Sequence, residues 1–145
     1  MSTGMFFGNT ITSLILPSTL TSFGDSAFSN SHSLSQINLL SGLTVLGSNI
    51  FNNCGQLVII TIPSTLTIVY DNAFSNCNIL TNIYLTLGLR VLGSNMFSYT
   101  GMGSLTIPSS ILSWGNNTFY GCNNLNNLFL MDGNYLNNTV LLFLI

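Results

Sequence analysis

The chain has 145 residues, with one Arg, no Lys, three Asp, no Glu and one His, so charged residues make up only 3% of it, against about 25% in an ordinary soluble domain. One cation cannot neutralise a run of phosphates, which argues against binding to nucleic acid or electrostatic binding to a membrane. The apolar fraction of 47% argues against intrinsic disorder.

Residues 1–12 are expected to form a partial first coil of a repeat array, because Phe6 is in phase with an aromatic column further on. No basic residue precedes the apolar Met5-Phe6-Phe7, so no signal peptide is visible. No apolar run reaches the roughly 18 residues that span a bilayer, and no transmembrane segment is expected. The length suits one domain, and we expect a single solenoid over residues 1–145.

A repeat of 22 or 23 residues runs through most of the chain. Its aromatic column consists of Phe6, Phe28, Phe51, Phe74, Phe97 and Phe119. No coil of this length can bury its apolar side alone, so the coils are expected to stack around a shared core. The predicted fold class is an α/β repeat solenoid of about six coils of 22–23 residues, with short parallel strands and single-turn helices on the return side.

The segment from Gln56 to Leu80 shows the expected content of one coil. Alternating inward residues up to Ile62 predict a short strand, which Pro63 ends because it has no backbone donor. Prolines recur in every second coil, at Pro17, Pro63 and Pro108, and we call these the odd coils. The even coils between them carry a Gly-Leu pair such as Gly88-Leu89 instead. Two coil types therefore alternate.

The return side of each coil predicts one capped helical turn. The residue three before each Phe is a strong N-cap type: Asp25, Ser48, Asp71, Ser94 and Asn116. The residue two after each Phe closes the turn: Asn30, Asn53, Asn76, Tyr99 and Gly121. Asn and Gly tolerate the left-handed conformation that ends a helix, so Tyr99 predicts a distorted turn.

The end of the chain departs from the repeat. After Met131 the apolar residues fall out of phase, which predicts a degenerate last coil over about residues 126–145. Asp132-Gly133-Asn134 is a turn signal. The final Val140 to Ile145 is apolar but too short to span a membrane.

The pattern Leu-x-x-Ile-x-Ile-Pro-x-x-Leu-x-x-Val-x-x-x-Ala-Phe-x-x-Cys at Leu57 to Cys77 resembles the BspA-type leucine-rich repeat, and the resemblance covers about residues 5–131. It implies a module of surface proteins of bacteria and of parasitic or commensal protists, associated with adhesion and protein binding. A cell-surface or extracellular location follows from the resemblance, which offers no catalytic residues to carry over. The absence of Lys and Glu departs from the usual pattern.

Three cysteines occupy one column, three residues after the Phe: Cys54, Cys77 and Cys122. We interpret this position as a small, half-buried slot that suits Cys. Cys54 and Cys77 lie on adjacent coils, within the distance of a disulfide, and that alternative stays open. The paired Cys or Cys/His spacing of a zinc site is absent, so neither a metal nor a cofactor is expected.

Few residues could carry chemistry. His32 is isolated after a turn, and Asp25 and Asp71 are accounted for as caps. No nucleophile and base recur together, so we expect no enzyme and no catalytic residues. The glycosylation patterns at Asn116 and Asn137 are matches that an Asn-rich chain yields by chance.

The binding residues are expected on the outward column of the main strands. This column reads Ile15, Asn38, Thr61, Tyr84, Thr106 and Phe129. The next outward column reads Ser13, Gln36, Ile59, Asn82, Ser104 and Asn127. Tyr84 and Phe129 are the strongest candidate anchors, because aromatic rings supply contact area at a low entropic cost. The alternative is that these are strand residues chosen for β-propensity alone.

We therefore expect a non-catalytic interaction or adhesion module whose strand face binds a protein or glycan ligand. The first alternative is a structural protein whose copies stack head to tail through uncapped solenoid ends, which weak charge repulsion would permit. A weaker alternative is an ice-binding face of Thr, Ser and Asn, which the interspersed Ile, Tyr and Phe disfavour.

Overall fold

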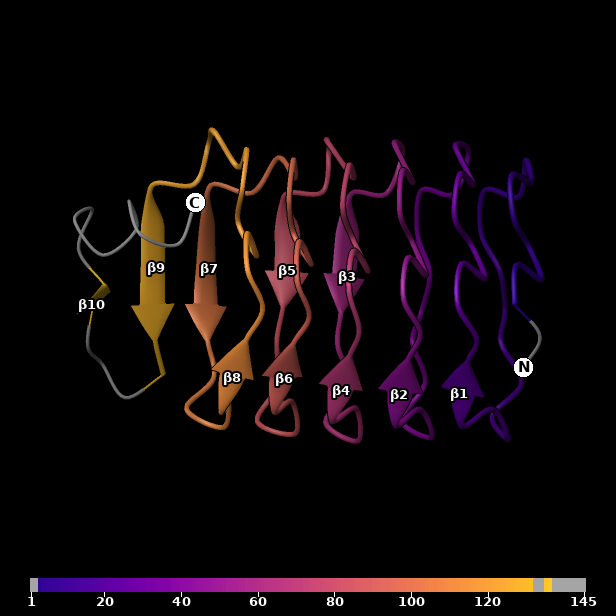
Figure 1. Cartoon of the computed structure of the whole chain (residues 1–145). Helices are drawn as coiled ribbons and strands as arrows, with labels where there is room; N and C mark the ends of the chain where they lie inside the picture. Colours follow the sequence, from indigo (N-terminus) through magenta and orange to yellow (C-terminus); the bar gives the residue numbers. More distant parts are fainter. Residues whose placement is uncertain (1–2, 132–134, 137–145) are drawn as a thin grey trace.

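The computed structural model describes residues 3–131 and 135–136 and shows a β-solenoid of five turns (Figure 1). One side of the solenoid is a five-stranded parallel sheet with one strand from each turn. Its strands are β1 (Ser22–Phe23), β2 (Val45–Leu46), β4 (Ile68–Val69), β6 (Val91–Leu92) and β8 (Ser113–Trp114). Register partners such as Val45 and Ile68 are one repeat apart, which confirms the repeat length.

The other side carries the strands predicted from the alternating pattern, running in the opposite direction in Figure 1. They are β3 (Ile59–Thr61), β5 (Asn82–Tyr84), β7 (Ser104–Ile107) and β9 (Asn127–Leu130). β3 pairs with β5 and β7 pairs with β9, both in parallel, but β5 and β7 belong to separate sheets. This side of the solenoid therefore has an interrupted hydrogen-bond ladder.

The solenoid has a single core, and its centre is the phenylalanine column. Rings of successive coils are parallel to within about 11° and their centroids are between 5.0 Å (Phe6 to Phe28) and 6.0 Å (Phe97 to Phe119) apart. From Phe28 onward the rings are fully buried. The predicted alignment of these side chains is confirmed.

The expected single-turn helices are wrong, because the described residues contain no helix. Asn72 and Asn76, on either side of Phe74, both have left-handed φ values, of 56° and 62°. A residue with positive φ immediately after the cap position cannot start a right-handed helix. The amides of alternate residues donate instead to the next coil, as Phe74 does to the carbonyl of Met96 at 2.9 Å. The return side is thus another ladder between coils, and the fold is a β-solenoid.

The cap role given to Asp25 and Asp71 is also corrected. The Oδ1 of Asp25 accepts a hydrogen bond from the amide of Ser48 at 2.8 Å, which lies one coil further on. Asp71 accepts from Ser94 in the same way at 2.7 Å. Each carboxylate therefore joins an odd coil to the following even coil, because without a helix there is no first helical turn for it to cap.

The left-handed position after each Phe is confirmed, with φ between 58° and 71° from Asn30 to Gly121. The expected distortion at Tyr99 is wrong, since its φ of 58° equals that of Asn30. Gly121, one coil further on, leaves room for the Tyr99 ring, because a Cβ there would lie 2.5 Å from it.

The alternation of two coil types has a packing cause. A Cβ at Gly88 would lie 1.8 Å from the carbonyl oxygen of Ser64, so the even coil needs glycine where the odd coil before it comes closest. In the other direction, the hydroxyl of Thr65 donates to the carbonyl of Leu43 at 2.7 Å. Ser110 makes the matching bond to Leu89. Odd and even coils thus make different, complementary interfaces.

The chain reverses direction after β9. The short strand β10 (Tyr135–Leu136) pairs with β9 in antiparallel orientation, unlike every other pairing in the structure described. The turn predicted at Asp132 to Asn134 and the apolar Val140 to Ile145 lie outside the described residues. The single solenoid over residues 1–145, with its partial first and degenerate last coils, stays a prediction.

Candidate functional site

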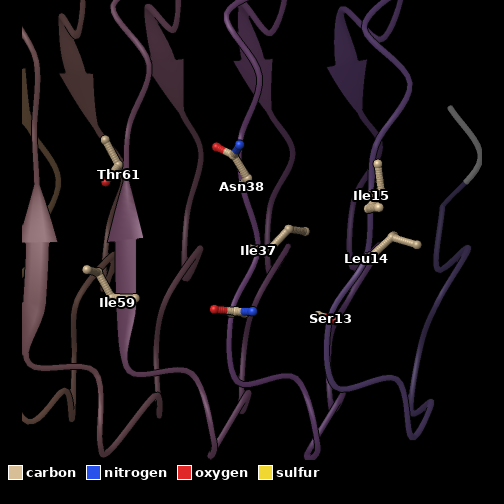
Figure 2. Close-up of a pocket in the computed structure, with 8 residues that line it drawn as sticks. Ser13, Leu14, Ile15, Ile37, Asn38, Ile59 and Thr61 are labelled. Carbon is tan, nitrogen blue, oxygen red and sulfur yellow. The ribbon is translucent and has the colours of Figure 1, made fainter.

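The candidate site is the surface formed by the two outward columns, which we call the strand face. The structure brings their members into register, since Thr61 pairs with Tyr84 and Thr106 pairs with Phe129. Ile15 and Asn38 lie outside the named strands, but Figure 2 shows them at the same level as Thr61 on neighbouring coils. The alternation that turns Ile60 and Ile83 into the core turns these residues outward.

Accessibility differs along the strand face. The exposed fraction is 96% for Ile15, 55% for Tyr84 and 42% for Ile59, while Asn38, Thr61 and Thr106 are also exposed. Phe129 is half-buried, and its register partner on the far side of β9 is Tyr135 of β10. Ile15 and Tyr84 are therefore the large apolar side chains that this face offers most freely.

The first hollow of the strand face lies over the first three coils and has a volume of about 380 Å³. Its floor is apolar, with Ile37 buried and Leu14 partly buried, and the exposed Ile15 and Ile59 form part of its wall. Figure 2 shows the side chains that line it. They are Ser13, Leu14, Ile15, Gln36, Ile37, Asn38, Ile59 and Thr61.

The second hollow lies between β5 and β7, where the ladder is interrupted, and has a volume of about 310 Å³. It is lined by residues 81–85 and 104–106 together with Met131. Tyr84 and the polar Asn82, Ser104 and Thr106 are all exposed. The two hollows thus flank the β3–β5 pair.

Neither hollow is lined by a charged residue. The only cation of the chain, Arg90, immediately precedes β6 in the five-stranded sheet. Among the described residues the carboxylates are Asp25 and Asp71, both engaged in the turns of the return side. The two hollows therefore offer apolar contact and neutral hydrogen-bonding groups.

The cysteine column is structural. Cys54, Cys77 and Cys122 are free and buried, so the disulfide alternative for Cys54 and Cys77 is not realised. Each thiol donates to the Phe carbonyl of the preceding coil, as Cys54 does to Phe28 at 3.1 Å. Burial raises the pKa of Cys54 to about 12 and raises the pKa of Cys77 and Cys122 as well. The thiols are therefore protonated donors rather than nucleophiles.

The remaining candidates do not form a site. His32 is exposed, as expected of a turn residue. Thr118 of the glycosylation pattern at Asn116 is buried, and its hydroxyl donates to Gly115 at 2.7 Å, while the pattern at Asn137 lies outside the described residues. The part of the chain that the structure describes holds no cluster of three metal-ligating side chains. Within the same residues, no helix is both long and apolar enough to cross a membrane.

Two surface features escaped the sequence reading. Leu112 is 75% exposed and borders a third hollow of about 240 Å³, with Trp114 and Leu130. The sequence did carry a signal for the exposed Leu112, because the other coils have Thr or Arg in the same column. On the return side, Tyr99 and Tyr120 pack edge to face at 5.4 Å.

The model of the BspA type leucine rich repeat region matches residues 1–126 in six copies. A leucine-rich repeat protein from Bacteroides ovatus ATCC 8483 is 32% identical, with a TM-score of 0.75 over 82% of this chain and 33% of that one. The leucine rich repeat protein of T. pallidum is 26% identical, with a TM-score of 0.79 over 83% and 59%.

A leucine rich cell surface protein from Faecalibacterium prausnitzii A2-165 has the same fold, at 21% identity and a TM-score of 0.63 over 86% of this chain and 44% of that one. The chain thus spans between a third and three-fifths of the length of these structures. No curated protein sequence matches it significantly.

Proposed function

The chain belongs to the BspA-type leucine-rich repeat family, and we propose that it is a non-catalytic interaction module that binds a protein ligand on its strand face. The observation that carries this proposal is the pair of hollows beside Ile15 and Tyr84, whose side chains are 96% and 55% exposed. Tyr is among the residues most often found as hot spots of protein interfaces, and Ile15 adds apolar contact area beside the first hollow.

A role in adhesion at the cell surface is the finer form of this proposal. It is supported by the family, and a protein with the same fold is described as a leucine rich cell surface protein. A solenoid suits such a role, because each added coil extends the strand face without changing the fold.

The test is binding of the chain to an array of extracellular matrix and cell-surface proteins. Ile15→Ser and Tyr84→Ala should each weaken a specific interaction at least about tenfold, the loss expected for removal of a hot-spot side chain. Leu112→Ser is the matched control, because Leu112 is equally apolar and 75% exposed but lies beside β8 in the other sheet. Equal losses in all three variants, or none, would contradict the strand face as the binding surface.

The second candidate is head-to-tail association of copies of the chain. It is supported by Met5 and Phe7, which are 53% and 59% exposed beside the half-buried Phe6 on the first coil. A further coil of a longer array would cover the same surface. Light scattering distinguishes association from a monomeric module. Association predicts a mass that rises with concentration, and Phe7→Ser should return this mass to that of a monomer. A monomer at all concentrations of the parent chain would exclude association.

A further inference from the structure

The second hollow lies where one coil is a residue short. From Tyr84 to Thr106 the step is 22 residues, and at the start of this coil a Cβ at Gly101 would lie 2.5 Å from the carbonyl oxygen of Asn78. Beyond this close approach β5 and β7 do not pair. The interruption therefore leaves backbone N–H and C=O groups along two facing strands outside any strand ladder.

The interruption is too narrow to admit another strand. Strands in a ladder are about 4.8 Å apart, so an inserted peptide would hold its neighbours about 9.6 Å apart. Cα atoms of β5 and β7 still approach within 8 Å of one another. A ligand of this hollow must lie on it rather than add a strand to the sheet.

The lining of the hollow combines one aromatic ring with neutral polar groups. Tyr84 lines the hollow and is 55% exposed, and Asn82, Ser104 and Thr106 beside it are exposed as well. Amide and hydroxyl side chains both donate and accept hydrogen bonds. A pyranose ring has the complementary chemistry, because one face of C–H groups packs on an aromatic ring while its hydroxyl groups donate and accept in the plane.

We propose that the hollow between β5 and β7 binds a neutral carbohydrate ring stacked on Tyr84. This inference rests on the proposed function, because the carbohydrate would be a glycan carried by the protein ligand. The volume of the hollow, about 310 Å³, is at the lower end for small-molecule sites, which suits one or two rings. The absence of Arg, Lys or His from the lining disfavours sialylated or sulfated sugars, whose charge would find no counterpart.

The first hollow provides the contrast. Its exposed anchors, Ile15 and Ile59, are aliphatic and offer no flat ring for a sugar. Ile15→Ala therefore serves as the control for a change on the same face but outside the carbohydrate site.

The experiment is an amide NMR titration of the full chain with cellobiose, lactose, maltose and N,N′-diacetylchitobiose, and with 3′-sialyllactose as the charged comparison. At least one neutral disaccharide should shift the amides of residues 82–85 and 104–106. Tyr84→Ala should weaken that binding at least tenfold, whereas Tyr84→Phe and Ile15→Ala should leave it within twofold. Tyr84 is exposed, and an unchanged thermal midpoint will show that its variants fold.

The proposal is overturned if none of the neutral sugars shifts these amides, if Tyr84→Ala binds as the parent does, or if the charged sugar binds equally well. If the chain binds a protein on the array while the sugar titration fails, the carbohydrate site is wrong but the proposed function stands. The protein ligand could still bind after its glycans are removed by enzymes and yet lose binding to Ile15→Ser. That result would support the interaction module and contradict the carbohydrate site.

Discussion

The Oδ1 of Asp71 accepts a hydrogen bond from the amide of Ser94 at 2.7 Å, across the junction between two coils. Directly beside it, the amide of Asn72 donates to the carbonyl of the same Ser94 at 2.8 Å. One residue of the even coil is thus held through both of its backbone groups by two neighbours in the odd coil. This makes the carboxylate a link between coils.

Asp71→Ala should lower the free energy of unfolding by about 1.5 kcal/mol, because it leaves the Ser94 amide without its charged acceptor. Asp71→Asn keeps an oxygen in the same place and should lose about half as much. Urea denaturation followed by circular dichroism measures both. An alanine variant as stable as the parent would show that water replaces the carboxylate at no cost.

Phe74→Ala should lower the free energy of unfolding by about 3–5 kcal/mol, the usual cost of removing a buried ring. The Phe74 ring lies between those of Phe51 and Phe97, with centroids at 5.5 and 5.7 Å, so its loss opens a cavity inside the stack. Phe74→Leu should cost less, since it keeps most of the volume. Tyr84→Ala, which removes an exposed ring, is the control and should change stability by less than about 0.5 kcal/mol.

Gly88→Ala should lower the free energy of unfolding by about 2 kcal/mol or more, because the new methyl group would overlap the carbonyl of Ser64 and force the coils apart. Gly55→Ala is the matched control, since the nearest atom there is Oδ1 of Asn78 at 3.7 Å, an ordinary contact. Chemical denaturation of the two single variants compares them. Equal stability of the two would mean that the Gly88 coil can shift freely.

Stability should fall above neutral pH through the buried thiols. Burial raises the pKa of Cys54 to about 12, whereas an unfolded thiol titrates near about 8.5. The folded chain therefore keeps a proton that the unfolded chain loses, so its stability is complete below about pH 8.5 and falls as the pH rises toward 12.

The slope should reach about 1.4 kcal/mol per pH unit for each such thiol. Cys54→Ser removes one titrating group and keeps a donor, as Ser31 does at the same position of its own coil. Its loss of stability between about pH 7 and about pH 10, measured under reducing conditions, should be smaller than that of the parent. Parallel pH profiles for the two chains would contradict the account.

Ligand binding at the strand face should change little with salt, because neither hollow is lined by a charged group. Raising the ionic strength from about 0.05 to about 0.5 M screens charge attraction strongly. The dissociation constant of a strand-face ligand should nevertheless stay within about twofold. A steep salt dependence would place the binding surface near Arg90 or the aspartates instead.

The stack and its core were predictable because Phe28, Phe51 and their successors recur at a regular spacing. This spacing can be recognised whatever the local structure of each coil. The prediction of a helical turn on the return side was wrong, because the cap column was considered without the column of residues that follows it. That following column reads Ser26, Asn49, Asn72, Asn95 and Asn117, all left-handed in the structure. Two Asn-rich positions four residues apart were the available signal against a helix.

The candidate site was predictable only in part. Strand alternation was enough to place Ile15 and Tyr84 outward, since it depends on neighbouring residues alone. The half-burial of Phe129 and the interruption between β5 and β7 were not predictable, because the first accompanies the antiparallel pairing of β9 with β10 and the second lies in a coil that is one residue short. Such features depend on how coils meet rather than on what each coil contains.

The hydrogen bonds between coils also determine how the molecule would respond to force. Among the described residues they join positions 21 to 26 apart, such as Thr67 and Thr44, and so link each turn to its neighbours. Pulling on the two ends of the chain would peel away one turn at a time, each releasing about 80 Å of slack. A tether made of such turns would lengthen in steps and absorb a load gradually instead of snapping open at once.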